Sequence, residues 1–262
     1  MAEILPIPSN PIDWECVDAA VFDLDGTLYL GESPLPGAME LLRSVPSRVS
    51  VKFLSNNTSK TPEQTYEKML RLGFTISSSQ VLSPLHGLCE AIRTAGFTKV
   101  WVMANAPVLA WLRAAMPQVD WRAPRSQTEC VIVTYDTTLT YQDLCEVAWR
   151  LQDGCAYWVT HPDYVCPDPQ GPVPDVGGLV EMWAIGYGRR PERCFGKPSP
   201  EVLSPVLANT SAERVLFVGD RLYTDWELSR QAKTQFRLSL AGETTPEMWL
   251  ALQGERPLIL PL

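Results

Sequence analysis

Short apolar runs alternate along the chain with amphipathic segments. Residues 19–24 (AAVFDL) form a continuous apolar run, which is typical of a strand buried on both faces. A second run over 49–54 (VSVKFL) predicts another strand, and 37–43 between them predicts a short helix. Residues 60–72 predict the next helix, because Thr61 can cap its start and a proline follows at the first helical position. Strands that alternate with helices indicate a parallel sheet covered by helices.

The same alternation continues through the middle of the chain and returns near its end. Further strands are predicted over 99–103, 130–134, 155–160, 214–218 and 236–240, and further helices over 107–116, 141–152, 179–187, 200–208 and 226–233. A stretch rich in proline and glycine, residues 161–178, is predicted as a long loop. The fold class that follows is α/β, with a doubly wound parallel sheet.

Length and composition limit the classes of function. The 262 residues are 45% apolar and 20% charged, with a net charge of −8, which argues against non-specific nucleic-acid binding. The seven cysteines are scattered without a CxxC pair, which argues against zinc or a disulfide framework and for a cytoplasmic protein. The start of the sequence lacks a basic segment, and no apolar run approaches the ~18–20 residues of a membrane span. We therefore expect neither a secretory signal nor a membrane partner.

Three of the predicted strands end in polar residues that can carry chemistry. Asp23 lies at the tip of the first strand, and Asp25 follows two residues later. Ser55 follows the second strand, and Asp220 follows the strand over 214–218. In open parallel sheets, ligand sites form at the carboxyl ends of the strands. We therefore expect segments that are far apart in the sequence to meet at one rim of the sheet.

Carboxylates that converge at one rim repel each other and raise each other's pKa values. Asp23 and Asp25 share a face of an extended chain, and Asp225 follows Asp220 on the next turn. A hard divalent cation removes this repulsion, and coordination by carboxylates and water suits Mg²⁺. Lys197, in the stretch CFGKPSP, is expected at a bend, where its ammonium can neutralise a carboxylate and a phosphate.

The run Ser55, Asn56, Asn57 lies between a strand end and a helix start. Its hydroxyl and backbone N–H groups are suited to holding an anion. A nucleophilic carboxylate, an acid/base partner, Mg²⁺, a cation and an anion cradle together describe phosphoryl transfer through an aspartyl-phosphate. Each feature alone also has a plain structural interpretation: a turn at the paired acids, a helix cap at this run, and a solvated lysine at position 197.

Four motifs, taken in order, resemble a known family. They are DLDGT (23–27), SNN (55–57), GKP (196–198) and GDRLYTD (219–225). They resemble the four motifs of the haloacid dehalogenase (HAD) superfamily of phosphohydrolases. The gap of more than a hundred residues between the second and third motifs resembles the type C2 cap of the NagD-like subfamily, which includes 4-nitrophenylphosphatases.

Stretches within that gap extend the resemblance to the cap. They are TYDTTLTYQDL (134–144), VTHPD (159–163) and PDVGGLVEMW (174–183). The resemblance implies a Rossmann-like HAD core made of residues 1–82 and 190–262, with an inserted α/β cap domain of residues 83–189. It also permits a homodimer through the cap, where tryptophans concentrate.

The resemblance also implies roles for the motif residues. Asp23 would be the nucleophile, and Asp25 would protonate the leaving oxygen and then activate water. The phosphate-binding residues would be Ser55, Asn56, Asn57 and Lys197, the last of which also offsets charge during catalysis. The Mg²⁺ site would comprise Asp23, Asp25 through its backbone carbonyl, Asp220 and Asp225, the last through water or by orienting the other ligands.

The sequence departs from the family pattern at several positions outside the four motifs. His161 stands where the family usually has asparagine, Asp175 where it has glycine, and Thr134 where it has glycine. Lys233 replaces a glycine expected at a helix end. The first three departures lie in the predicted cap, so they affect the identity of the substrate more than the type of reaction. The candidate substrate contacts in the cap are His161, Asp163 and Asp136.

The predicted function is that of a Mg²⁺-dependent phosphomonoester hydrolase acting on a small phosphorylated metabolite. A phosphosugar mutase would use the same aspartyl-phosphate, and a catalytically silent HAD-like binding protein would share the fold. The four intact carboxylate and lysine positions, Asp23, Asp25, Asp220 and Lys197, argue against the silent alternative.

Overall fold

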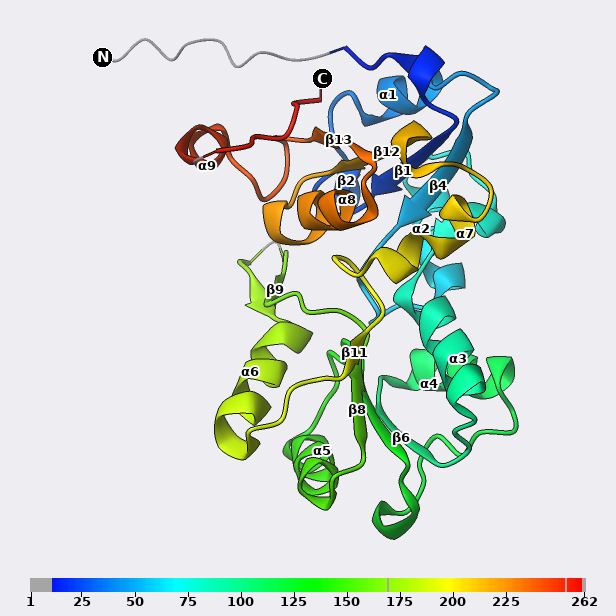
Figure 1. Cartoon of the computed structure of the whole chain (residues 1–262), viewed down its shortest axis with the longest axis vertical. Coiled ribbons are helices and arrows are strands. Elements are labelled where there is room, and N and C mark those ends of the chain that lie inside the picture. Colours follow the sequence, from blue (N-terminus) through cyan, green and yellow to red (C-terminus); the bar gives the residue numbers. More distant parts are fainter. Residues whose placement is uncertain (1–10, 169, 253, 261–262) are drawn as a thin grey trace. The chain divides into compact units, whose positions relative to one another are not determined.

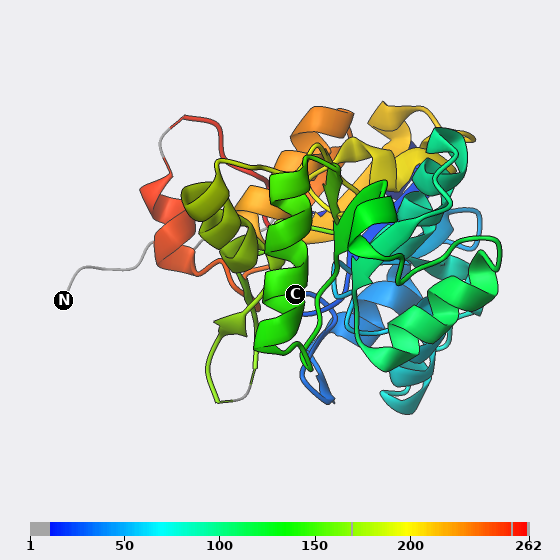
Figure 2. The ribbon, with the colours of Figure 1, turned by 90° about the horizontal axis from the view of Figure 1, so that it is seen from below.

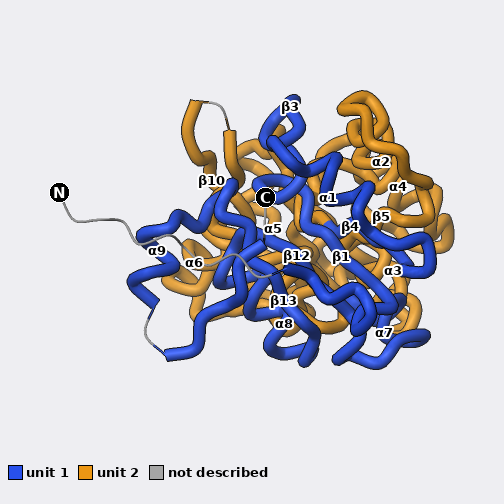
Figure 3. The backbone as a smooth tube through the Cα atoms, turned by 90° about the horizontal axis from the view of Figure 1, so that it is seen from above, with its two compact units in different colours: residues 1–54, 203–262 blue, residues 55–202 orange. Residues whose placement is uncertain are grey.

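The computed structural model of the chain describes residues 11–168, 170–252 and 254–260. Its backbone contacts divide the chain into two compact units (Figure 3). Unit 1 comprises residues 1–54 and 203–262, and unit 2 comprises residues 55–202. The predicted borders of the inserted cap, after residues 82 and 189, stay a prediction.

Unit 1 is built around parallel strands in the order β13–β12–β1–β4 (Figure 1). Their bounds are β1 (Ala19–Asp23), β4 (Ser50–Leu54), β12 (Val215–Gly219) and β13 (Gln235–Leu238). All five residues of β1 are buried, as the continuous apolar run predicts for a strand covered on both faces. The register pairs Phe22 with Val218 and Asp23 with Leu54, which aligns the carboxyl ends of these strands.

Shorter elements complete unit 1. They are β2 (Tyr29–Leu30), β3 (Ser33–Pro34), α1 (Ala38–Ser44), α7 (Ser204–Leu207), α8 (Glu227–Ala232), α9 (Pro246–Ala251), the 3₁₀ turns η1 (Trp14–Cys16) and η5 (Ala212–Arg214), and the π-helical turn η6 (Leu222–Trp226). The predicted helix over 226–233 is therefore only partly α-helical, because its first residue belongs to the π turn. The β2–β3 hairpin was not predicted, since strands of two residues leave no alternating pattern.

Unit 2 contains a second parallel sheet, in the order β11–β8–β7–β6. Its strands are β6 (Val100–Met103), β7 (Cys130–Val133), β8 (Ala156–Val159) and β11 (Arg193–Cys194). Alternate side chains of these strands face opposite sides, so one face packs on α3 and α4 and the other on α5 and α6 (Figure 2). The predicted α/β class with parallel sheets is confirmed.

The other elements of unit 2 are mostly helices. They are α2 (Pro62–Arg71), α3 (Pro84–Ala95), α4 (Ala106–Ala115), α5 (Tyr141–Asp153), α6 (Val176–Tyr187), the short strands β5 (Val81–Leu82), β9 (Val165–Cys166) and β10 (Val173–Pro174), and the 3₁₀ turns η2 (Ser78–Gln80), η3 (Arg125–Gln127) and η4 (Pro200–Leu203), the last residue of which belongs to unit 1. The prediction of a continuous loop over 161–178 is wrong in part. This stretch contains the β9–β10 hairpin, and its last residues belong to α6, which begins at Val176 because Asp175 caps it.

Helix caps explain where several helices begin. Thr61 caps α2 as predicted, because its hydroxyl accepts the backbone N–H of Gln64 and the Gln64 side chain bonds back to the Thr61 N–H. Helix α3 was missed although it carries the same signals. Ser83 caps its start, and Gly96 ends it in the left-handed conformation.

Lys233 ends α8 in the left-handed conformation, with φ of 58°. It is the one non-glycine residue with positive φ among the described residues. A side chain there costs about 1–2 kcal/mol, whereas glycine loses about 0.5–1 kcal/mol of backbone entropy on folding. We expect Lys233→Gly to raise the melting temperature by about 2–4 °C, measured by thermal unfolding. Lys233→Ala keeps the Cβ and serves as the control; equal effects of the two variants would contradict this account.

The surface of α6 carries exposed apolar side chains, at Met182, Ile185 and Tyr187. They are compatible with the expected homodimer, which stays a prediction. Within the described ranges, no helix has the length and apolar character that crossing a bilayer requires. The expected cytoplasmic location also stays a prediction.

Candidate active site

Three of the predicted carboxylates form a buried cluster in unit 1. Asp23 is the last residue of β1, Asp220 follows the last residue of β12, and Asp225 lies in η6. One carboxylate oxygen from each lies within 4.8 Å of the others, and all three side chains are buried. The parallel register of β1 and β12 therefore brings together acids that are about two hundred residues apart in the sequence.

Asp220 is the most heavily constrained member of this cluster. Burial, followed by the nearby charges of Asp23 and Asp225, raises the pKa of Asp220 well above its usual range. Its Oδ2 accepts the backbone N–H of Glu243 at 2.6 Å. Thr27 donates its hydroxyl toward Asp23 Oδ2 at 3.2 Å and Asp220 Oδ1 at 3.4 Å. The carboxylates are thus held in place at an electrostatic cost.

The π turn fixes Asp225 so that it supports the loop that carries Asp220. The Asp225 Oδ2 accepts the backbone N–H groups of Asp220 at 2.9 Å and Arg221 at 3.0 Å. Single π turns of this kind occur frequently at functional sites. Arg221 in the same loop forms an ion pair with Glu243 at 3.0 Å. Asp225 therefore orients the turn after β12 and faces the other two acids at the same time.

Asp25 lies just outside the buried cluster and is half-buried. The Tyr29 hydroxyl donates to Asp25 Oδ2 at 3.3 Å. Gly26 between them has φ of 89°, which favours glycine, and its N–H donates to the Tyr29 carbonyl at 2.8 Å. The tight turn after β1 thus separates Asp23, in the cluster, from Asp25, which has a more exposed environment.

Glycines surround the carboxylates at distances that exclude a side chain. A Cβ added at Gly26 would lie 2.3 Å from Asp220 Oδ2, and one at Gly242 would lie 2.0 Å from the same atom. A Cβ at Gly219 would lie 2.4 Å from Asp225 Oδ2. Backbone from three separate segments therefore packs directly against the acidic cluster.

These residues fit a hard divalent cation. The donor set is made only of carboxylate oxygens, which Mg²⁺ prefers, and the three acids are close enough to share one ion. Three buried carboxylates within 4.8 Å are costly when charged, as the raised pKa of Asp220 indicates, and a cation offsets that cost.

Unit 2 holds the other predicted motif residues in a separate arrangement. Asn56 Oδ1 accepts the Lys197 backbone N–H at 2.8 Å, and Asn56 Nδ2 donates to the Lys197 carbonyl at 3.0 Å. We call this pair of hydrogen bonds the Asn56 clamp. Asn56 Nδ2 also donates to Asp163 Oδ1 at 3.1 Å. A Cβ added at Gly196 would lie 2.5 Å from Asn56 Oδ1, so the glycine of the GKP motif is required for the clamp.

The remainder of the SNN run is fixed by its own side chains. Ser55 accepts the backbone N–H of Asn57 on its hydroxyl oxygen at 3.1 Å. Asn57 Oδ1 in turn accepts the backbone N–H of Ser59 at 3.0 Å. Asn105, the cap of α4, donates its side-chain amide to the Ser59 carbonyl at 2.7 Å. The loop after β4 is therefore held by hydrogen bonds at both of its ends.

The candidate substrate contacts in the predicted cap are buried and hydrogen-bonded. His161 Nε2 lies 2.9 Å from Asp175 Oδ1. These two side chains and Asp163 lie within 4.8 Å of one another, but His161 Nε2 and Asp175 are hydrogen-bonded directly to each other, which an ion between them would have to break, so we do not assign a metal to them. Asp136 Oδ1 accepts both the N–H and the hydroxyl of Thr138 at 2.7 Å. A substrate contact for any of them stays a prediction.

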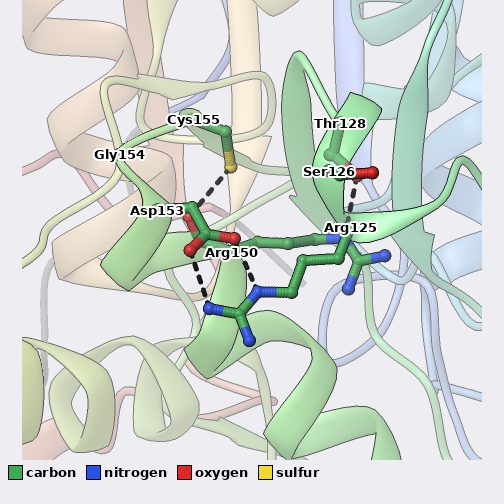
Figure 4. Close-up of a pocket in the computed structure, with 7 residues that line it drawn as sticks. All are labelled: Arg125, Ser126, Thr128, Arg150, Asp153, Gly154 and Cys155. Carbon is green, nitrogen blue, oxygen red and sulfur yellow. Dashed lines mark hydrogen bonds and ion pairs between the residues drawn. The ribbon is translucent and has the colours of Figure 1, made fainter.

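A pocket of about 690 Å³ lies elsewhere in unit 2 (Figure 4). Two arginines line it, but their charges are balanced by neighbouring carboxylates. Arg125 bonds to both oxygens of Asp153, at 2.6 and 2.7 Å, and Arg150 pairs with Glu146. The Arg150 Nε donates to the Thr128 hydroxyl at 3.0 Å. This pocket contains none of the predicted site residues.

Comparison with known proteins identifies the family. The haloacid dehalogenase-like hydrolase family matches residues 20–116, and a HAD-hydrolase-like family matches residues 194–259. Glycerol-3-phosphate phosphatase of Rattus norvegicus is 31% identical over 88% of this chain and 81% of its own length. The chain belongs to the haloacid dehalogenase-like hydrolases. The predicted resemblance is therefore confirmed.

Other relatives of this chain share its fold or are named as phosphatases. The crystal structure of 4-nitrophenylphosphatase from Thermotoga maritima superposes with a TM-score of 0.86, at 29% identity and 94% coverage of both chains. D-glycerol 3-phosphate phosphatase of Mycobacterium tuberculosis is 28% identical over 91% of this chain, which spans 66% of that protein. These names support the predicted class of phosphoric monoester hydrolase.

A solved structure of the Mycobacterium tuberculosis glycerol phosphate phosphatase is a complex with magnesium. It superposes on this chain with a TM-score of 0.80, at 25% identity, and covers 93% of this chain and 74% of its own. The fold expectation, a Rossmann-like HAD core with a cap, agrees with both superpositions.

Sequence reasoning missed several residues that shape the acidic cluster. Thr27 lies within the DLDGT motif, yet only the structure reveals its hydroxyl between two carboxylates. Gly242 and Glu243 lie in the loop after β13, and only the structure reveals that they pack against Asp220. The prediction covered the charged members of the cluster but not the backbone that holds them.

Proposed function

We propose that this chain is a Mg²⁺-dependent phosphomonoester hydrolase that acts on a small phosphorylated metabolite through an aspartyl-phosphate intermediate. The observation that carries the proposal is the buried cluster of Asp23, Asp220 and Asp225, which lies at the carboxyl ends of β1 and β12. Such a cluster suits one hard cation beside one nucleophilic carboxylate. Membership of the HAD family supports the same reaction class.

Asp23 and Asp25 divide the chemistry between them. A carboxylate oxygen of Asp23 attacks phosphorus, and the bond from phosphorus to the leaving oxygen breaks. Asp25 gives its proton to that oxygen, then takes a proton from the water that hydrolyses the aspartyl-phosphate, which restores both side chains. Half-burial and the Tyr29 hydrogen bond suit Asp25 for proton exchange with substrate and water.

Mg²⁺ would be held by the carboxylates of Asp23 and Asp220 and by the backbone carbonyl of Asp25, with Asp225 acting through water or by orienting the other ligands. The bound ion would neutralise the negative charge that the carboxylates and the phosphate bring together. The hydrogen bonds from Thr27 and from the Glu243 N–H orient these ligands without adding charge.

Ser55, Asn56, Asn57 and Lys197 would bind the phosphoryl group. Ser55 directly follows Leu54, the residue that the sheet register pairs with Asp23. The Asn56 clamp holds the Lys197 backbone, which supports a fixed position for its ammonium. The Asn56 amide is engaged in that clamp, so its contribution to phosphate binding would come through its backbone N–H.

The proposal is tested by a phosphate-release assay with Mg²⁺ on a panel of phosphate esters. The panel includes glycerol 3-phosphate and 4-nitrophenyl phosphate, which the names of the relatives suggest, with nucleoside monophosphates, phosphoglycolate, sugar phosphates and pyridoxal phosphate. We expect free phosphate from at least one small ester. Interconversion of sugar phosphates without phosphate release would instead indicate a mutase, and no turnover of any ester would favour a silent binding protein.

Removal of the metal is expected to abolish turnover and lower stability. Chelation leaves the three carboxylates without a counter-ion, so the rate should fall to background and return when Mg²⁺ is added. At a concentration ~100 times its dissociation constant, Mg²⁺ is expected to stabilise the protein by about 2.7 kcal/mol, measured as a rise in melting temperature. Hydrolysis at an unchanged rate in excess chelator would contradict the proposed cofactor.

A further inference from the structure

The two departures at His161 and Asp175 meet in the structure. His161 is completely buried, and its Nε2 lies 2.9 Å from Asp175 Oδ1. Asp175 is also buried, and the same oxygen accepts the N–H of Val176 at the start of α6. We call this contact the His161–Asp175 pair. It joins the loop after β8 to the first turn of α6.

The pair continues into a row of hydroxyl groups. His161 Nδ1 lies 3.0 Å from the hydroxyl oxygen of Thr160, which lies 2.9 Å from that of Thr58. Thr58 Oγ1 accepts the backbone N–H of Tyr135 at 3.0 Å. Thr58 and Thr160 are both completely buried, so each hydroxyl must find its partners within the protein. The row ends one residue after the SNN motif.

The row has one consistent direction when the imidazole is neutral. An aspartate can only accept, so His161 Nε2 carries the proton and donates it to Asp175. His161 Nδ1 must then accept, so the Thr160 hydroxyl donates to it. The Thr160 oxygen in turn accepts the hydroxyl hydrogen of Thr58. The Thr58 oxygen accepts the backbone N–H of Tyr135. The Val133 carbonyl lies 3.5 Å from the Thr160 oxygen and is a more distant acceptor than His161 Nδ1 at 3.0 Å.

The His161 loop also supports the Asn56 clamp. Asp163, two residues after His161, accepts the Asn56 side-chain amide at 3.1 Å. A Cβ at Gly196 would lie 3.0 Å from the His161 Cβ and 2.8 Å from the Thr160 carbonyl oxygen. Movement of the His161 loop would therefore displace Asp163, which accepts from Asn56, and the atoms of this loop against which Gly196 packs.

We propose that the His161–Asp175 pair is a positioning pair that fixes the Asn56 clamp, and with it Lys197 and the SNN loop, for binding the phosphoryl group. The effect on phosphate rests on the proposed function, in which Lys197 and the SNN loop bind that group. The pair itself acts through the clamp and does not touch the reacting atoms.

Four variants test the pair. Asp175→Ala removes the oxygen that accepts from His161 Nε2. Thr160→Val removes the hydroxyl that donates to His161 Nδ1 but keeps the shape of the Thr160 side chain. Each is expected to raise KM for 4-nitrophenyl phosphate, and the inhibition constant of inorganic phosphate, about tenfold. Asp175→Asn keeps an acceptor for a neutral imidazole and is expected to stay within about twofold of wild type. Glu181→Gln, on the surface of α6, is the matched control and should change neither constant.

Two results would overturn the proposal. One is a lower melting temperature in the Asp175→Ala and Thr160→Val variants with unchanged KM and inhibition constant, which would make the pair merely structural. The other is an Asp175→Asn variant as impaired as Asp175→Ala, which would require a charged partner and thus a different protonation of the row.

A readout independent of turnover separates this proposal from the proposed function. The chain has two histidines, so nitrogen NMR can distinguish His161 from the exposed His86. We expect an Nε2-bound proton on His161 that exchanges slowly with water in wild type and Asp175→Asn, and rapidly in Asp175→Ala. A proton on Nδ1 would overturn the proposal. If wild type hydrolyses no ester, the proposed function fails, and calorimetric binding of inorganic phosphate with Mg²⁺ still tests the clamp: an equal affinity in Asp175→Ala and wild type overturns the positioning role.

Discussion

Replacing Asp23 by asparagine is expected to reduce turnover of 4-nitrophenyl phosphate by roughly 10,000-fold or more, as loss of a nucleophile does in other enzymes. The amide keeps the shape of the side chain but cannot attack phosphorus and is a weak metal ligand. Asp23 closes a fully buried strand, and asparagine can still accept the Thr27 hydroxyl, so the fold should persist. Steady-state rates with Mg²⁺, together with circular dichroism and thermal unfolding, measure both parts of this prediction.

Asp18→Asn is the matched control for that variant. Asp18 immediately precedes β1 and forms an exposed ion pair with Arg214 at 2.5 Å, and exposed pairs contribute little to stability. The control should hydrolyse the ester at the wild-type rate. A rate close to wild type in Asp23→Asn would show that another group attacks phosphorus and would remove the basis of the proposed mechanism.

Gly242→Ala is expected to lower kcat/KM by roughly a hundredfold, because the new Cβ would lie 2.0 Å from Asp220 Oδ2. Gly242 has no positive φ, so the substitution tests space and not backbone strain. Asp220 must move or the loop after β13 must shift, and either change disturbs the carboxylates that would hold Mg²⁺. The measurements are kcat/KM and the Mg²⁺ concentration that gives half-maximal rate, which should rise.

Gly186→Ala is the control for the glycine substitution. Gly186 lies near the end of α6, where an added Cβ meets nothing within 4 Å. Alanine favours a helix over glycine by about 1 kcal/mol, so this variant should be slightly more stable and equally active. Wild-type activity and Mg²⁺ dependence in Gly242→Ala would mean that the tight packing around Asp220 is not needed for catalysis.

The apolar runs predicted the main strands well because burial on both faces leaves a continuous signal. The strand tips then predicted which acids would gather, and Asp23, Asp220 and Asp225 do lie together. Their convergence follows from parallel strands whose carboxyl ends share one edge, a geometric rule that needs no knowledge of side-chain contacts. The separation of Asp25 from the cluster depends on the turn at Gly26 and required the structure.

Hydrogen-bond partners far apart in the sequence could not be predicted from it. His161 and Asp175 each looked like an isolated departure within a loop rich in proline and glycine, yet they bond to each other. Nothing in the local sequence links Asn56 to Lys197, because the two are 141 residues apart and only the fold of the segment between them brings them into contact. Helix α3 is a different case, since its spacing of apolar residues and its caps were present and were overlooked.

The Asn56 clamp joins two points that are 141 residues apart in the sequence. The two ends of the long segment between them therefore lie close together. A segment with adjacent ends can change in length at little cost, since each doubling of a closed loop adds only about 0.6 kcal/mol of closure entropy. We therefore expect this segment to tolerate insertions and deletions, provided that Asn56 and Lys197 still form their two hydrogen bonds.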